Sequence, residues 1–109
     1  MDLDKFKACI EACNTCANYC DYCATSCLRE DNVQMMAECI RLDMQCAQIC
    51  RLAASFMAQG SEYAKDVCRI CADICKKCGD ECAKHEATHC QECAKACHRC
   101  AEECAAMAS

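Results

Sequence analysis

The chain has 109 residues, of which 19 are cysteine and none is proline or tryptophan. Its formal net charge is −5, and acidic and basic residues are interspersed, so no basic surface for nucleic acid is expected. No stretch approaches the roughly 20 apolar residues that span a bilayer, and the length suits one core, so we expect a single domain over residues 1–109 with no membrane partner.

The first predicted helix runs from about residue 3 to residue 28, with Asp2 or Asp4 near its N-cap. Its cysteines follow one another at alternating steps of four and three residues. Such steps average about 3.5 residues, close to one helical turn, so they place the thiols in a single stripe along one face. That stripe consists of Cys9, Cys13, Cys16, Cys20, Cys23 and Cys27.

The second predicted helix follows a polar turn at residues 29–32, is capped by Asp31 or Asn32, and runs to about residue 58. Asp43 either ligates a metal or hydrogen-bonds a protonated thiol, or it faces solvent while Leu42 points inward. The seam has fewer thiols in this helix, and it continues as Met36, Cys39, Asp43, Cys46, Cys50, Ala53 and Met57. A second apolar face predicts burial against another copy of the chain, hence a homo-oligomer; it comprises Ile40, Met44, Ile49, Leu52 and Phe56.

The third and fourth predicted helices are separated from the rest by a clear break. Gly60 and Ser61 suit a helix C′ position and the N-cap of a third helix that runs to about residue 84. Thr88 and Gln91 match a capping box and open a fourth helix, which runs to about residue 107. Both helices repeat the cysteine stripe, as Cys68, Cys71, Cys75, Cys78 and Cys82 and then as Cys90, Cys93, Cys97, Cys100 and Cys104.

Four such helices with short loops predict an all-α fold, an antiparallel up-down-up-down four-helix bundle with a cysteine-lined core. Neighbouring cysteines of a stripe have Cβ atoms about 5–6 Å apart, whereas a disulfide needs about 3.8 Å. Disulfides between different helices stay geometrically open, but 19 is an odd number and leaves at least one thiol over. We expect a reducing, cytoplasmic compartment in which many thiols stay free. Residues 1–7 show no basic region leading into an apolar run, so no signal peptide is expected.

A core lined with thiols indicates binding of soft metal ions, because leucine or isoleucine would fill the same space without an oxidation liability. Four thiolates around each zinc ion leave a net charge of about −2, and the seams hold no basic residue to offset it. Cu(I) is monovalent, accepts two or three ligands and can share bridging thiolates. Multiple Cu(I) ions per chain are therefore predicted, with a zinc- or cadmium-sequestering, metallothionein-like protein as the alternative.

An enzymatic role is not expected, because the sequence shows no nucleophile–base pair, phosphate-binding loop or defined substrate pocket. A redox enzyme or disulfide-based switch is a third class to consider. Thioredoxin-type chemistry, however, uses one Cys-x-x-Cys motif beside a βαβ pattern, and no strand pattern is present. Iron–sulfur clusters would leave most of the thiols unused.

The order of the helices gathers Met35, Met36, His85 and His89 at one end of the bundle. All four are ligand types that copper accepts, so this end is the predicted copper entrance; in the alternative, both histidines are polar loop residues. His98 is expected at the surface. The other end is predicted to form an apolar plug from Leu3, Phe6, Phe56, Met57, Tyr63 and Met107.

The four cysteine stripes resemble those of the bacterial copper storage protein family, in particular its cytosolic branch, over essentially the whole chain. The resemblance implies a bundle that stores and sequesters many Cu(I) ions, for copper homeostasis and detoxification. It also implies a homotetramer, copper donors or acceptors as partners, and an occasional ligand other than cysteine. The candidate ligands are all nineteen cysteines together with Asp43, His85 and His89.

Overall fold

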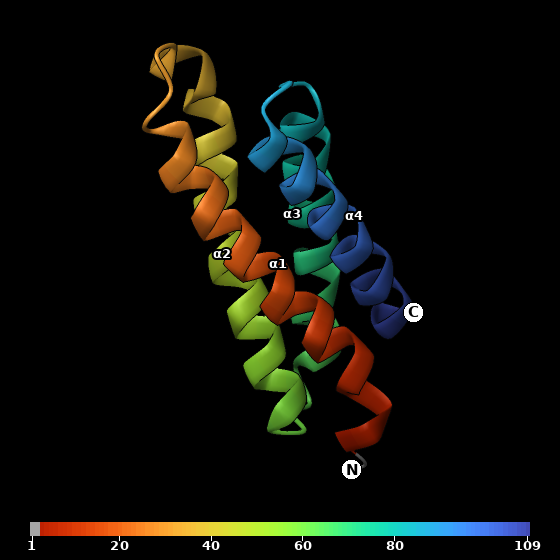
Figure 1. The fold of residues 1–109 in the computed structure, drawn as a ribbon. Coiled ribbons are helices and arrows are strands. Elements are labelled where there is room, and N and C mark those ends of the chain that lie inside the picture. The colour runs from red at the N-terminus through yellow and green to blue at the C-terminus, as the bar shows by residue number, and fades with distance from the viewer. Residues whose placement is uncertain (1–2) are drawn as a thin grey trace.

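The computed structural model describes residues 3–109, and the elements within that range are helical, with no strand (Figure 1). The Asp2 cap considered above lies outside the described residues. In chain order the elements are η1 (Leu3–Phe6), α1 (Lys7–Cys27), η2 (Val33–Met36), α2 (Ala37–Ala58), α3 (Ala64–Ala83) and α4 (Thr88–Ala108), where η denotes a 3₁₀ turn.

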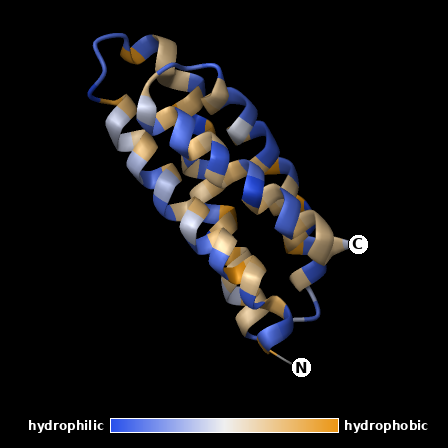
Figure 2. Cartoon of the chain, turned by 45° about the vertical axis from the view of Figure 1, so that its right-hand side comes forward, coloured by the Kyte–Doolittle hydropathy of each residue, from blue (hydrophilic) through white to orange (hydrophobic). Residues whose placement is uncertain are grey.

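The α-helices form one elongated bundle that measures 48 × 18 × 18 Å. α1 packs against α2 and α4, and α3 packs against the same two helices, so α1 and α3 occupy opposite corners. Hydrophilic and hydrophobic positions alternate along each helix, as an amphipathic repeat requires (Figure 2). This confirms the predicted all-α, up-down-up-down architecture. Over residues 3–109, no helix combines the length and apolar character needed to cross a bilayer.

Gly60 ends α2 as predicted, with a φ of 67° that suits glycine. Its N–H donates to the carbonyl of Met57 at 3.1 Å, and the Ser61 N–H donates to the carbonyl of Phe56 at 3.0 Å. These two bonds form a Schellman motif. Ser61 is not the N-cap of α3, because Tyr63 holds that position; the Ser61 hydroxyl instead accepts a bond from the Tyr63 N–H at 3.0 Å.

The N-cap residues of α1 and α2 are Phe6 and Met36, not the residues that the sequence predicts. Asp4 lies inside η1, and neither α1 nor α2 has a side-chain hydrogen bond at its N-cap. Asn32 precedes η2, where its backbone carbonyl, not its side chain, accepts a bond from the Met35 N–H at 3.0 Å. Both helices therefore begin with a tighter 3₁₀ turn, whose i→i+3 bonds take the place of a side-chain cap.

The predicted capping box at the start of α4 is also wrong. α4 begins at Thr88 without a side-chain cap, and Gln91 faces the preceding turn. Its side-chain Nε2 donates to the carbonyl of Ala83 at 3.1 Å and to that of His85 at 2.6 Å. Gln91 therefore satisfies carbonyls that the end of α3 leaves free, and it fixes the α3–α4 turn.

Gly79 allows a side chain of α4 to lie directly against α3. A Cβ atom at this position would stand 2.5 Å from Cδ2 and 2.6 Å from Nε2 of His98. The same His98 Nε2 is 2.9 Å from the Asp80 carboxylate, and the histidine side chain is 41% exposed. His98 is thus a surface residue that joins α3 to α4, in agreement with the prediction that it lies outside the thiol core.

Candidate metal centre

All nineteen cysteines are free thiols in the bundle core, and none is more than 1% exposed. The burial follows from the sequence repeat, because steps of three and four residues keep every cysteine on the inward face of its helix. Alanines such as Ala17, Ala47 and Ala53 fill the remaining buried positions. The core is consequently a column of sulfur rather than of branched aliphatic side chains.

The thiols gather in fours, with the ligand atoms of each group all within 4.8 Å of one another. Each of the five groups named below draws sulfurs from three helices. Cys16 and Cys46 belong to two of the groups, and Cys20 and Cys97 continue into a third, so these three groups form a connected series rather than isolated sites. Five of the groups are Cys13, Cys71, Cys100 and Cys104; Cys16, Cys46, Cys50 and Cys75; Cys16, Cys20, Cys46 and Cys97; Cys20, Cys78, Cys93 and Cys97; and Cys23, Cys27, Cys39 and Cys90.

The shortest sulfur–sulfur separations join different helices. Cys39 and Cys82 are 3.3 Å apart and Cys46 and Cys75 are 3.4 Å apart, whereas Cys46 and Cys50, one turn apart on α2, are separated by 3.9 Å. These separations allow one ion to be shared by thiolates of neighbouring helices with metal–sulfur bonds of about 2.3 Å. A bridging, multinuclear arrangement is therefore the chemistry that the core suits best.

Burial favours the neutral form of two thiols at the mouth of the core, Cys27 and Cys90. Burial raises the pKa of Cys27, and it raises the pKa of Cys90 to about 11. A monovalent ion that replaces each proton leaves the core neutral again, because one positive charge leaves for each one that enters. Binding of a soft monovalent ion is thus an exchange of charge that the buried site can accommodate.

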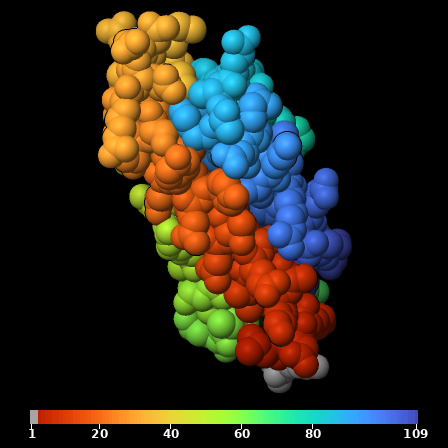
Figure 3. Space-filling view, viewed as in Figure 1, coloured from red at the N-terminus to blue at the C-terminus, as the bar shows by residue number. Residues whose placement is uncertain are grey.

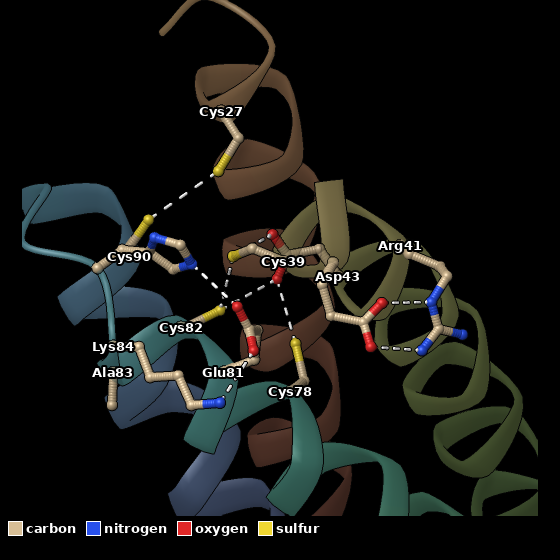
Figure 4. A network of polar contacts seen from close by, with 12 residues as sticks. Cys27, Cys39, Arg41, Asp43, Cys78, Glu81, Cys82, Ala83, Lys84 and Cys90 are labelled. Carbon is tan, nitrogen blue, oxygen red and sulfur yellow. Dashed lines mark hydrogen bonds and ion pairs between the residues drawn. The ribbon is translucent and has the colours of Figure 1, made fainter. Parts of the chain in front are cut away.

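Asp43 is fully buried within the sulfur column (Figure 4). Its Oδ1 accepts hydrogen bonds from the thiols of Cys78 at 3.2 Å, Cys93 at 3.3 Å and Cys82 at 3.5 Å, and its Oδ2 accepts one from Cys39 at 3.8 Å. Burial, together with the nearby Cys93 and Cys39 sulfurs, raises the pKa of the carboxyl to about 8. The alternative in which Asp43 faces solvent is therefore wrong.

His89 reaches the core from the first turn of α4. Its Nδ1 lies 3.4 Å from the sulfur of Cys23 and 3.5 Å from that of Cys90, and the two sulfurs are 3.9 Å apart. An ion bound in a plane by two sulfurs at about 2.3 Å and one nitrogen at about 2.0 Å separates these atoms by roughly 3.7–4.0 Å. The three atoms thus approximate a three-coordinate site for a soft ion.

The turns around His89 form the mouth that the helix order predicts. A hollow of about 520 Å³ lies between the turn after α1 and the α3–α4 turn, and its lining includes Met35, Met36 and His85. These two turns lie side by side in Figure 3. Met36 is buried and Met35 is exposed. His85 is mostly buried, and its Nε2 is 3.0 Å from the Glu81 carboxylate. All four predicted entrance residues therefore lie at one end.

The opposite end is only partly the apolar plug that the sequence predicts. Met57 is fully buried, and Phe6 and Met107 pack against the core. Leu3 and Tyr63, by contrast, are more than half exposed. Leu3 opens η1 and Tyr63 is the N-cap of α3, so both residues lie at the very end of the bundle.

Comparison with known proteins decides the family. The family model described as Csp, copper storage protein, matches residues 2–109. The chain belongs to the copper storage protein family. No curated protein sequence matches it significantly.

Solved structures of copper storage proteins are similar to this chain along nearly its whole length. Copper storage protein 3 of Bacillus subtilis is 51% identical; its Cu(I)-bound form covers 95% of this chain and 98% of its own, with a TM-score of 0.92. The metal-free form of that protein gives a TM-score of 0.91. A cytosolic copper storage protein of Streptomyces lividans, described as carrying five coppers, is 38% identical over 98% of this chain and 94% of its own, with a TM-score of 0.93.

Two acidic residues of the copper storage bundle were not anticipated from the sequence. Glu30 lies 2.9 Å from Nε2 of His89, and Glu81 pairs with His85. Glu81 precedes His85 by four residues, a spacing that places two side chains together on a helix, so this pair could have been found. Glu30 and His89 are 59 residues apart, and no local spacing signals their contact.

Proposed function

We propose that this chain stores and sequesters multiple Cu(I) ions in the thiol column of its bundle, for copper homeostasis and detoxification. The observation that carries the proposal is the column of nineteen buried free thiols, whose sulfurs gather in groups of four. The Cu(I)-bound Bacillus subtilis relative supports it. Residues 1–109 act as one metal-storage domain whose task is binding rather than catalysis.

The proposed ligands are the nineteen cysteines, with Asp43 as a non-cysteine member of the core and His85 and His89 at the mouth. Copper enters at the mouth, where thioether, imidazole and thiol groups lie within one end of the bundle. These donors are all soft enough to pass a Cu(I) ion inward. Because the Streptomyces lividans relative is described as cytosolic and thiols persist in a reducing compartment, we place this chain in the cytosol as well.

An anaerobic Cu(I) titration of the metal-free protein tests the storage function. We expect saturation near one ion per thiol, hence near the 19 cysteines of the chain, with close to one proton released per ion. Apparent affinity should rise with pH, since the raised pKa values of Cys27 and Cys90 keep protons on sulfurs at the mouth that copper must displace. A parallel zinc titration should saturate near a quarter of the thiol count. Saturation at only a few Cu(I) ions per chain would contradict the storage function. The alternative of a zinc-sequestering protein gains no support from the family to which the chain belongs.

A homo-oligomer, most simply a tetramer as the resemblance implies, is proposed from the second apolar face of α2. Met44 is 54% exposed and Leu52 is 44% exposed on that face, and Ile49 lies beside Leu52 in a shallow hollow that α3 helps to line. Sedimentation velocity at micromolar concentration should give a species larger than a monomer, and Leu52→Glu should dissociate it. A wild-type chain that sediments as a monomer would contradict the proposal.

A further inference from the structure

The ring of His89 has a different partner at each nitrogen. Nδ1 faces the sulfurs of Cys23 and Cys90, whereas Nε2 lies 2.9 Å from the carboxylate of Glu30. An ionised carboxylate accepts hydrogen bonds but cannot donate them, so the proton of the neutral ring belongs on Nε2. The lone pair of the ring then belongs to Nδ1, which is the atom that faces the thiols.

Glu30 is itself held in place by the end of α1. Its backbone N–H donates to the carbonyl of Cys27 at 3.1 Å, which closes the turn directly after the last thiol of that helix. The side chain of Glu30 is 41% exposed, whereas that of His89 is 13% exposed. The contact therefore joins the C-terminal end of α1 to the N-terminal end of α4 across the mouth.

We propose that Glu30 is a positioning residue for copper uptake, which fixes the His89 ring so that the Nδ1 lone pair points at Cys23 and Cys90. The inference rests on the proposed Cu(I) storage function. Hydrogen bonds to the outer nitrogen of a histidine ligand commonly fix its tautomer and orientation, and their loss costs about 10–100-fold in affinity or activity. Without Glu30, the ring can rotate or carry its proton on Nδ1, and the three-atom site at the mouth is lost.

The other histidine of the mouth lacks this arrangement. Glu81 and His85 both belong to α3 and the turn that follows it, so their contact spans one helical turn and joins no second helix. Glu30 is therefore the carboxylate whose removal should separate positioning of a mouth ligand from general negative charge at this end.

The test compares Glu30→Ala and Glu30→Gln with Asp31→Asn and with His89→Ala. In the metal-free protein, long-range ¹H–¹⁵N NMR of the histidine rings reports which nitrogen of His89 carries the proton. We expect the Nε2–H form in the wild type, its loss in Glu30→Ala, and its retention in Glu30→Gln, because the amide oxygen still accepts the bond. Asp31→Asn removes the same charge from the same turn and should keep the wild-type signal.

Stopped-flow uptake of less than one equivalent of Cu(I), delivered from a weak chelator, supplies the second measurement. Glu30→Ala should slow uptake by roughly tenfold, close to His89→Ala, whereas Glu30→Gln should retain most of the wild-type rate. An unchanged tautomer in Glu30→Ala, or equal slowing by Asp31→Asn, would overturn the positioning role. The number of Cu(I) ions bound at equilibrium separates failure of the positioning role from failure of the storage function. Wild-type protein that does not load near its thiol count disproves storage. The tautomer of His89 in the metal-free protein still tests the role of Glu30.

Discussion

Loading the bundle with Cu(I) is expected to raise its melting temperature by at least about 20 °C. Each of the five four-sulfur groups named above takes its ligands from three helices, so the folded chain presents donor sets that an unfolded chain has to assemble. A ligand at 100 times its dissociation constant adds about 2.7 kcal/mol per independent site to the free energy of unfolding. In a domain of this size, each added kcal/mol raises the melting temperature by about 4 °C. Two sites held this tightly already account for the expected rise.

Circular dichroism at 222 nm under anaerobic conditions measures the shift as copper is added in steps. The unfolded chain also binds Cu(I) through its thiols, so the gain should fall below the sum over all sites. A variant with alanine at Cys16, Cys46, Cys50 and Cys75 serves as the control, because it removes one central group, breaks the neighbouring group that shares Cys16 and Cys46, and leaves the group at the mouth. It should bind about four fewer ions and gain less stability. A melting temperature that does not change at saturation would contradict copper binding across helices.

The sequence predicted the bundle and the burial of its thiols because both depend on a local repeat. Steps of three and four residues fix the inward face of each helix, whatever its neighbours are. The repeat also placed Asp43 in the seam, one helical turn after Cys39, but it could not exclude that Leu42 faced inward instead. Both residues are in fact buried, and Asp43 is the more deeply so. The buried face of α2 is wide enough to include both neighbouring residues, so burial of Leu42 did not require Asp43 to face solvent.

One error and one omission concern contacts that depend on how the helices meet. Gln91 has the spacing of a capping residue, yet it bonds to the end of α3, because the tight α3–α4 turn brings free carbonyls within its reach. Glu30 follows a helix as an ordinary polar turn residue, and its contact with His89 arises only when α1 and α4 meet at the mouth. Packing of the helices decides such pairs, and a single sequence carries no periodic signal of it.

Replacing Asp43 with asparagine is expected to stabilise the metal-free protein increasingly as the pH rises. Burial raises the pKa of this carboxyl to about 8, against about 4 for an unfolded aspartate. Between these values the folded state binds one more proton than the unfolded state, so the contribution of Asp43 to stability is greatest below pH 4 and is lost as the pH approaches 8. Asparagine removes this titration and keeps an oxygen that accepts bonds from the thiols of Cys78 and Cys93.

Urea unfolding of reduced, metal-free protein at several pH values measures this effect. The free energy of unfolding of Asp43→Asn, relative to wild type, should grow by on the order of 3 kcal/mol between pH 5 and pH 8, since each pH unit contributes about 1.4 kcal/mol. Asp73→Asn removes a carboxylate from the exposed face of α3 and is the matched control. If the difference in free energy of unfolding between Asp43→Asn and wild type stays constant with pH, or if Asp73→Asn shows the same trend, ionisation of Asp43 does not destabilise the folded state. The expected result would mean that the buried carboxylate lowers the stability of the metal-free protein. Such a cost is what we expect of a residue that is retained because it binds copper.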